Sequence, residues 1–137
     1  MADLKILAAF HQVEILNELC AESREFLASY SSFRPIRKGE TLFCENEPSP
    51  YCFGFLSGEI TLVSSKEPEK INRYGPGQLL GGLSLLAERP RPGLASVVAE
   101  GQLLAVCSSR FREWVKNERQ KNRQPAIVAE LQNRLQK

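Results

Sequence analysis

Short runs of β-forming residues, separated by turn clusters, occupy the chain from residue 33 to residue 106. The turn clusters combine glycine, proline, serine and charged residues, and they lie at residues 38–40, 47–50, 56–59, 67–69 and 75–77. Short runs with turn signals of this kind are typical of an antiparallel sandwich or barrel. Residues 59–62 alternate polar with apolar, as a strand buried on one face does. We therefore expect a mainly β fold with flanking helices, a double-stranded β-helix (jelly-roll) barrel of about eight short strands in two sheets.

The residues before this region have a helical pattern. Apolar side chains recur at intervals of three and four between residues 15 and 30, and a shorter apolar pattern covers residues 4–11. We expect two helices within residues 3–31, with a possible interruption at residues 21–23 where Ser23 is suited to cap a helix.

A second helical region follows Cys107. Ser108 and Ser109 are suited to cap a helix over about residues 110–117, and the polar run at residues 117–124 indicates a bend or linker. Pro125 suits the first position of a last helix. The chain then divides into an N-terminal helical segment (1–32), a barrel (33–107) and two C-terminal helices (108–137) within one compact domain.

The last helix carries a narrow apolar stripe, made of Ile127, Val128, Leu131 and Leu135. A short helix with such a stripe is marginal alone, so we expect it to pack against something. Two interpretations remain open: the stripe folds back on the barrel mouth, or it pairs with a partner protein or a second copy of the chain.

Length, charge and cysteine usage exclude several classes of protein. The 137 residues suit one domain, and a net charge of +2 gives no global field for nucleic acid. No apolar run reaches membrane-spanning length, and the first residues lack the layout of a signal peptide. The four cysteines contain no Cys-x-x-Cys pair, which argues against zinc and against a disulfide framework and favours the cytoplasm. With His11 as the single histidine, we expect no catalytic residues, no metal and no enzymatic activity.

The stretch from residue 75 to residue 98 has the composition of a phosphate site. Gly81 and Gly82 have no side chains to shield their amides, and residues 83–86 indicate a brief helix whose first amides lack internal partners. Such amides suit a phosphate group. Arg91 is the preferred candidate for its positive partner, with Arg89 as a competitor, and Ser96 adds a hydroxyl donor.

This stretch resembles the phosphate-binding cassette of the cyclic nucleotide-binding domain family, the module of catabolite activator proteins and protein kinase A regulatory subunits. The family pattern is roughly Gly-Glu-x-Ala-Leu, a spacer, then Pro-Arg-x-Ala-Thr/Ser, and residues 81–85, 90–91 and 95–96 match it here. Residues 37–43, 53–60 and 74–81 match three further family segments in the same order. The resemblance implies a jelly-roll barrel, and it implies cAMP or cGMP as the ligand, with no other cofactor.

The ligand-binding residues that the resemblance implies are Gly81, Gly82, Leu83, Ser84, Arg91, Ala95 and Ser96. The cassette departs from the family pattern in two ways. Gly82 replaces the glutamate that accepts a hydrogen bond from the ribose 2′-hydroxyl, and the spacer after Arg91 is about two residues longer. A buried hydroxyl without its partner costs about 1–3 kcal/mol, or about tenfold to over a hundredfold in affinity.

Two functions follow as expectations. The first is a non-enzymatic regulatory module that senses a cyclic nucleotide through a degenerate cassette and relays the effect of binding through the C-terminal helices. The alternative is a nucleotide-independent adaptor that uses the same fold to bind a partner protein.

Two further features of the C-terminal region leave alternatives open. A basic run is either a solvated helix face or a contact for nucleic acid or an acidic partner, and it contains Arg110, Arg112, Lys116, Arg119, Lys121 and Arg123. Since the chain stops at Lys137 without the helix-turn-helix of the family's transcription factors, we expect no DNA reading. Trp114 either stacks on a base or anchors its helix to the barrel.

Overall fold

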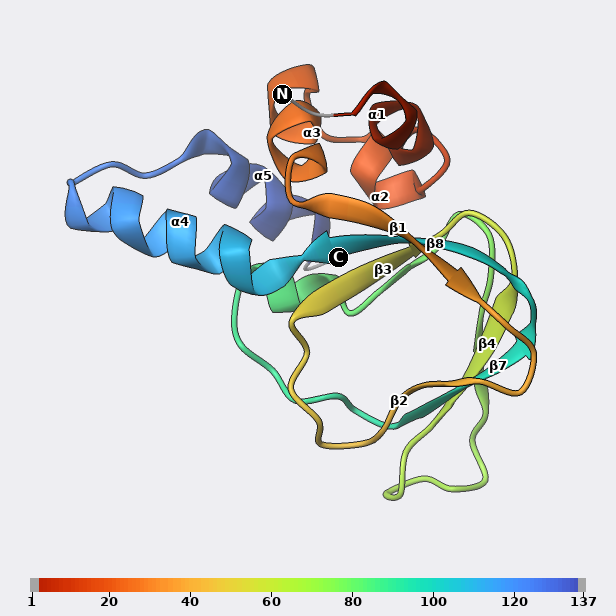
Figure 1. The fold of residues 1–137 in the computed structure, drawn as a ribbon. Helices are drawn as coiled ribbons and strands as arrows, with labels where there is room; N and C mark the ends of the chain where they lie inside the picture. The colour runs from red at the N-terminus through yellow and green to blue at the C-terminus, as the bar shows by residue number, and fades with distance from the viewer. Residues whose placement is uncertain (1–2, 136–137) are drawn as a thin grey trace.

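A computed structural model describes residues 3–135 of the chain (Figure 1). Three helices come first, α1 (Leu4–Phe10), α2 (Glu14–Asn17) and α3 (Ala21–Ala28). The strands are β1 (Ser31–Ile36), β2 (Thr41–Phe43), β3 (Tyr51–Phe55), β4 (Glu59–Val63), β5 (Asn72–Tyr74), β6 (Leu79–Leu80), β7 (Leu94–Ala99) and β8 (Gly101–Cys107). A short 3-10 helix, η1 (Gly82–Leu85), lies between β6 and β7, and the chain ends with α4 (Ser108–Gln120) and α5 (Ala126–Leu135).

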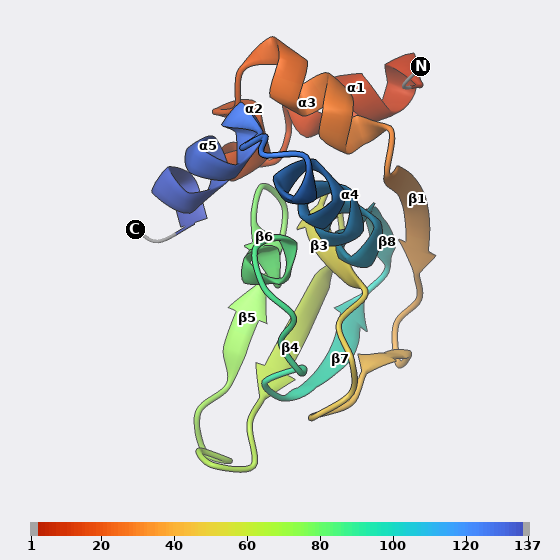
Figure 2. The same cartoon turned by 90° about the vertical axis from the view of Figure 1, so that its left-hand side faces the viewer.

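The eight strands form two antiparallel sheets of four strands each. One sheet has the order β1-β8-β3-β6 and the other the order β2-β7-β4-β5, and Figure 2 shows β5, β4 and β7 side by side. In β4 the buried Ile60 and Leu62 alternate with half-buried neighbours, because successive side chains of a strand point to opposite faces. The predicted mainly β jelly roll with helices at both ends is confirmed.

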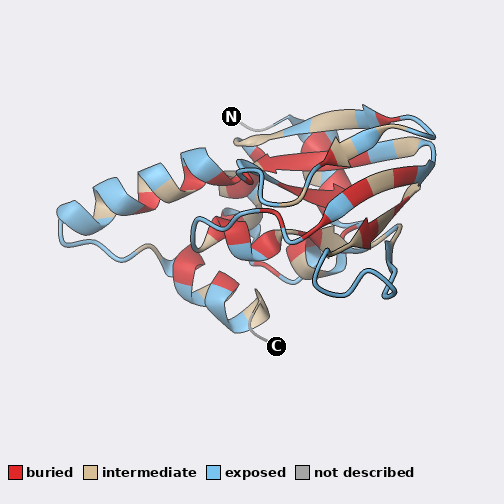
Figure 3. Ribbon diagram, turned by 90° about the horizontal axis from the view of Figure 1, so that it is seen from below, coloured by how far each residue is buried: buried red, intermediate tan, exposed pale blue. Residues whose placement is uncertain are grey.

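The first sheet is covered on both faces. Phe53, Phe55, Leu103 and Ala105 point into the barrel, where they join a barrel core with Phe43, Ile60, Leu62, Leu80, Ala95 and Val97. The intervening residues Cys52, Leu104 and Val106 belong instead to a helical core with residues of all five α-helices. Figure 1 shows the N-terminal helices over this sheet, and Figure 3 shows the buried residues lining the barrel and the inner sides of the helices. One sheet therefore separates two apolar cores.

The N-terminal segment holds three helices where the sequence predicted two. Helix α3 begins at Ala21, and the residue at its N-cap position is Cys20, whose side chain makes no capping hydrogen bond. Ser23 is buried inside α3, so its predicted role as a cap is wrong. Its hydroxyl instead donates to Glu130 of α5 at 2.6 Å. Ser23 thus joins α3 to α5 near the far end of the chain instead of capping its own helix.

The C-terminal helices also differ in their bounds from the prediction. Helix α4 runs to Gln120, so much of the polar run expected to form a linker is helical. Ser108 is the first helical residue, and it packs at zero exposure instead of capping the helix. Ile127, Val128 and Leu131 are buried in the helical core. The apolar stripe therefore folds back within the chain, onto the N-terminal helices and η1.

Candidate functional site

A cavity of about 470 Å³ lies beside the glycine-rich stretch. We call it the cassette cavity. Its walls come from β4, β5, β6, η1 and the loop before β7, and the residues that line it are Ser49, Leu62, Tyr74, Leu80, Gly81, Gly82, Leu83, Ser84, Arg89, Pro90 and Pro92. A cavity of this size is within the range that holds a small organic ligand.

The backbone at the cassette requires glycine. Gly81 has a φ of 79°, a left-handed conformation that residues with a Cβ adopt at a cost, and it is the residue before η1. The Ser84 amide donates to the Gly81 carbonyl at 3.0 Å, so this amide closes the first turn of η1. The Gly82 and Leu83 amides come earlier in the turn. They are the donors that a short helix leaves without partners of its own.

The loop before β7 holds Arg91 with its side chain inward. The Arg91 amide donates to the Glu47 carbonyl at 2.8 Å, and the Arg91 carbonyl accepts from the Asn46 amide at 2.9 Å. The Ser49 hydroxyl donates to the carbonyl of Arg89, which lies two residues before Arg91 in the same loop. These bonds fasten the loop to residues 46–49 at Arg89 and at Arg91, and only 4% of the Arg91 surface is exposed.

The Arg91 guanidinium lies in the barrel against aromatic side chains. Its Nη2 donates to the Tyr51 carbonyl at 2.7 Å. Its Cζ lies 4.2 Å from the centre of the Phe43 ring and 5.3 Å from that of Phe53. Its Nη1 abuts Gly81, where a Cβ would come within 3.0 Å of it. The guanidinium therefore lies directly behind a residue that lines the cassette cavity, although Arg91 itself does not line it.

Arg91 is a buried cation without an ion pair among residues 3–135. Burial lowers the pKa of its guanidinium, and Cys52 and Glu47 act in the opposite direction. Cys52 supplies no anion near neutral pH, because burial raises the pKa of its thiol to about 12. The Glu47 carboxylate accepts a hydrogen bond from the Cys44 amide. Arg91 Nε has no hydrogen-bond partner among the described residues, so the guanidinium has a donor left for an anion.

The structure brings together only some of the predicted site residues. Gly81, Gly82, Leu83 and Ser84 line the cassette cavity together with Arg89. The Ser84 hydroxyl is bonded to Ser108 of α4 at 2.6 Å and is therefore engaged.

The two predicted residues on β7 lie away from the cavity lining. Ala95 packs in the barrel core, and Ser96 pairs with Thr41 and Thr61 on the opposite face of the strand. Because the residues on either side of Ser96 are apolar, the sequence pattern indicates that the Ser96 side chain points outward. Leu62 and Tyr74 line the cavity without having been predicted there; the alternation of β4 marks Leu62 as inward.

The space beside Gly82, where the side chain of the family's glutamate would begin, is occupied by two leucine side chains. A Cβ on Gly82 would lie 2.7 Å from Leu79 Cδ2 and 2.9 Å from Leu135 Cδ2. The C-terminal end of α5 thus packs against the residue that replaces the family's glutamate. A longer side chain at this position requires Leu79 and Leu135 to move.

Trp114 is an anchor between helices. Its ring centre lies 4.1 Å from that of Phe26 on α3, and both rings pack against the helical core. This packing favours the role of an anchor, but the helix is anchored to α3 and not to the barrel as the sequence predicted.

The protein-family model described as "Cyclic nucleotide-binding domain" matches residues 33–118 of the chain. The chain belongs to the cyclic nucleotide-binding domain family. A curated member of this family, the CRP-like cAMP-activated global transcriptional regulator of Mycobacterium tuberculosis, is 24% identical over 82 residues. That alignment covers 57% of this chain and 36% of the regulator, so the chain spans well under half the length of the curated relatives it matches.

Solved structures of cyclic nucleotide-binding domains share the fold. The N-terminal domain of a transcriptional regulator from Streptomyces coelicolor A3(2) has a TM-score of 0.68 at 22% identity, covering 93% of this chain and 87% of that one. The regulatory domain of Toxoplasma gondii PKA, solved with cAMP, has a TM-score of 0.67 at 20% identity, covering 88% and 49% of the two chains. Within residues 3–135, no helix combines the length and the apolar character needed to cross a membrane.

Proposed function

We propose that this domain is a non-enzymatic regulatory module that binds a cyclic nucleotide in the cassette cavity. The observation that carries the proposal is the Arg91 guanidinium, which is buried behind Gly81 and has no carboxylate partner in the part of the chain that the structure describes. Leaving a charge buried and unpaired is costly, so a bound anion would gain by approaching it. The cyclic phosphate is the anion that the family's ligands supply. A rearrangement at Gly81 would bring this phosphate and the Arg91 guanidinium together.

The proposed ligand is held mainly through its phosphate. We assign the phosphate to the part of the cavity lined by Arg89, Gly82 and Leu83, and within residues 3–135 no carboxylate lines the cavity for the ribose hydroxyls. We therefore expect cAMP or cGMP to bind about tenfold to a hundredfold more weakly than in a cassette that has the glutamate.

Helix η1 offers a route by which the cavity affects the C-terminal helices. The Ser84 hydroxyl bonds to Ser108 at 2.6 Å, and the Ser84 carbonyl accepts from Arg112, so two polar contacts join η1 to α4. A ligand that moves η1 would have to move α4 or break these bonds.

Calorimetric titration with cAMP and with cGMP tests this proposal. We expect saturable binding by the wild-type domain, loss of binding in Arg91→Met, and unchanged binding in the control Arg110→Met, which alters an exposed arginine outside the cavity. The proposal fails if neither nucleotide binds at about 1 mM. It also fails if Arg91→Met binds as well as the wild type.

A second candidate function is a nucleotide-independent adaptor. The specific observation in its favour is that Arg91 already contacts Tyr51, Phe43 and Phe53, while Leu135 packs against Gly82. This function predicts no binding of either nucleotide in the same titration, and a folded Arg91→Met variant that still binds the partner protein.

A further inference from the structure

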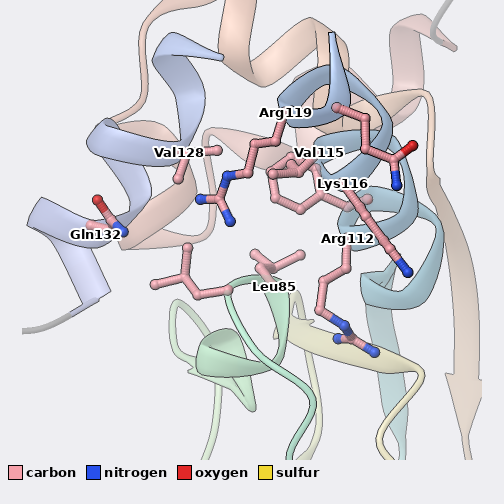
Figure 4. Close-up of a pocket in the computed structure, with 10 residues that line it drawn as sticks. Leu85, Arg112, Val115, Lys116, Arg119, Val128 and Gln132 are labelled. Atoms are coloured by element: carbon pink, nitrogen blue, oxygen red, sulfur yellow. The ribbon is translucent and has the colours of Figure 1, made fainter. Parts of the chain in front are cut away.

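A second cavity, separate from the cassette cavity, lies between α4, α5 and η1 (Figure 4). It has a volume of about 340 Å³, and we call it the α4–α5 groove. Its floor is apolar and includes Leu85 of η1, Val115 of α4 and Val128 of α5. These three side chains are already part of the helical core, so the floor is firmly placed.

Three cations stand along one wall of the groove. Arg112, Lys116 and Arg119 come from α4 at intervals of four and three residues, which puts them on one side of the helix. No carboxylate lines the groove, and within residues 3–135 none of the three takes part in an ion pair. The nearby Glu118 is engaged instead with Lys121 and Arg123, at 3.6 Å and 3.8 Å.

The cations differ in how they face the groove. Figure 4 shows the Arg119 guanidinium directed into the space between α4 and α5, above Leu85 and beside Val128. Its Nε donates to Gln124 at 3.0 Å, which leaves its terminal nitrogens toward the groove. The Arg112 guanidinium points toward η1 and bonds the Ser84 carbonyl, and Lys116 is exposed between the two arginines.

We propose that the α4–α5 groove binds an acidic amphipathic helix of a partner protein. Charge complementarity and the linear arrangement of the cations carry this inference. Arg112 and Arg119 are seven residues apart on a straight helix, which is about 10 Å along its axis. A single compact anion is too small to face all three cations, whereas a helix with acidic residues at intervals of three and four repeats their spacing.

The apolar floor completes the fit to an amphipathic helix. Large apolar side chains next to the acidic edge of the incoming helix would enter the groove over Leu85 and Val128. The carboxylates would stay at the partly exposed wall, where they set the orientation of the helix and its rate of association. This groove lies outside the cassette cavity, so the inference does not depend on nucleotide binding.

A designed peptide tests the proposal by fluorescence anisotropy. The probe is a labelled helical peptide of about 16 residues, long enough to hold a helix, with glutamates spaced three and four residues apart beside a leucine face. We expect the double variant Lys116→Glu/Arg119→Glu to weaken its binding by about tenfold or more. The control Arg110→Glu makes the same kind of charge change on α4 outside the groove, and we expect it to alter binding by less than about threefold.

A second variant tests the apolar half of the groove without disturbing the core. Gln132 is an exposed residue of α5 that lines the groove, so Gln132→Leu extends the floor, and we expect it to tighten binding of the same peptide. The proposal is overturned if the peptide does not bind, or if Arg110→Glu weakens it as much as the double reversal does. It is also overturned if a polyglutamate peptide of equal charge binds as tightly. Finally, the proposal is overturned if the domain binds duplex DNA or laurate but not the peptide, and the double variant loses that binding.

Discussion

At the scale of single residues, Arg91 allows a test of whether a buried charge serves structure or ligand binding. Its burial costs desolvation of several kcal/mol, and the Tyr51 hydrogen bond and the two aromatic contacts together offset about 3–6 kcal/mol, a similar amount. Methionine fills a similar volume and makes favourable contacts with aromatic rings. We therefore expect Arg91→Met to leave the free energy of unfolding unchanged, or to raise it by about 1 kcal/mol, in urea titrations without ligand.

The opposite result would identify Arg91 as a structural residue. If Arg91→Met lowers the free energy of unfolding by about 2 kcal/mol or more, the aromatic and carbonyl contacts outweigh the desolvation cost. Arg91→Lys is a useful companion variant because it keeps the charge and loses the planar stack on Phe43.

A second residue-scale prediction concerns the contact between Gly82 and Leu135. Because a Cβ on Gly82 would overlap only the flexible ends of Leu79 and Leu135, which can shift at modest cost, we expect Gly82→Ala to lower the free energy of unfolding by about 1 kcal/mol or less. Leu135→Ala removes one of the obstructing side chains. A double-mutant cycle measured by urea unfolding should therefore show Gly82→Ala to be less costly in the Leu135→Ala background. Strict additivity would show that α5 does not press on the cassette.

At the scale of elements, a carboxylate on α5 holds the C-terminal helix to the N-terminal ones. Glu130 accepts a 2.6 Å hydrogen bond from the Ser23 hydroxyl and another from the Cys20 amide at the start of α3. Burial alone would raise the pKa of Glu130, but the hydrogen bonds from Ser23 and Cys20 and the charge of Arg134 outweigh it and lower the pKa. The contact thus favours the ionised carboxylate in the folded protein.

The pH dependence of this contact has a definite sign. Since the folded pKa of Glu130 is depressed, its stabilisation is fully present above the unfolded value of about 4.3 and is lost as the pH falls through the folded pKa. We expect Glu130→Gln to lower the free energy of unfolding at pH 7 by about 1 kcal/mol, since the site is partly exposed. The difference from wild type should shrink below about pH 4 in urea titrations. A difference that stays constant down to about pH 3 would contradict this assignment.

Element boundaries show where sequence reasoning reached its limit. The alternation at residues 59–62 predicted β4 because the burial of each side chain depends only on the face of the sheet that the residue occupies. The start of α3 was predicted at Ser23 instead of at Ala21, and the contact of Glu130 with Cys20 was not predicted because the two residues are 110 positions apart in the chain. Likewise, the inward placement of Arg91 rests on backbone bonds to residues 46 and 47, which no local pattern contains.

At the scale of the whole molecule, the family motifs predicted the jelly roll because their order along the chain fixes the order of its strands. They also placed Gly81, Gly82, Leu83 and Ser84 at one cavity. They did not indicate that two apolar cores share one sheet, since that arrangement depends on how α1, α3 and α5 cover its outer face. Nor did they indicate the α4–α5 groove, which exists because α5 folds back beside α4.

The shared sheet predicts that both cores unfold together. Leu104 faces the helical core and its neighbour Leu103 faces the barrel core, so loss of one layer removes support from the other. Trp114 fluorescence reports the helical side and the Ile60 methyl signal the barrel side. We expect one urea midpoint from both probes, and we expect Leu104→Ala to lower the free energy of unfolding by about 2–4 kcal/mol and to shift both transitions equally. If the Trp114 transition comes at lower urea than that of Ile60, the helices form a separate unit, and the sheet does not couple the two layers.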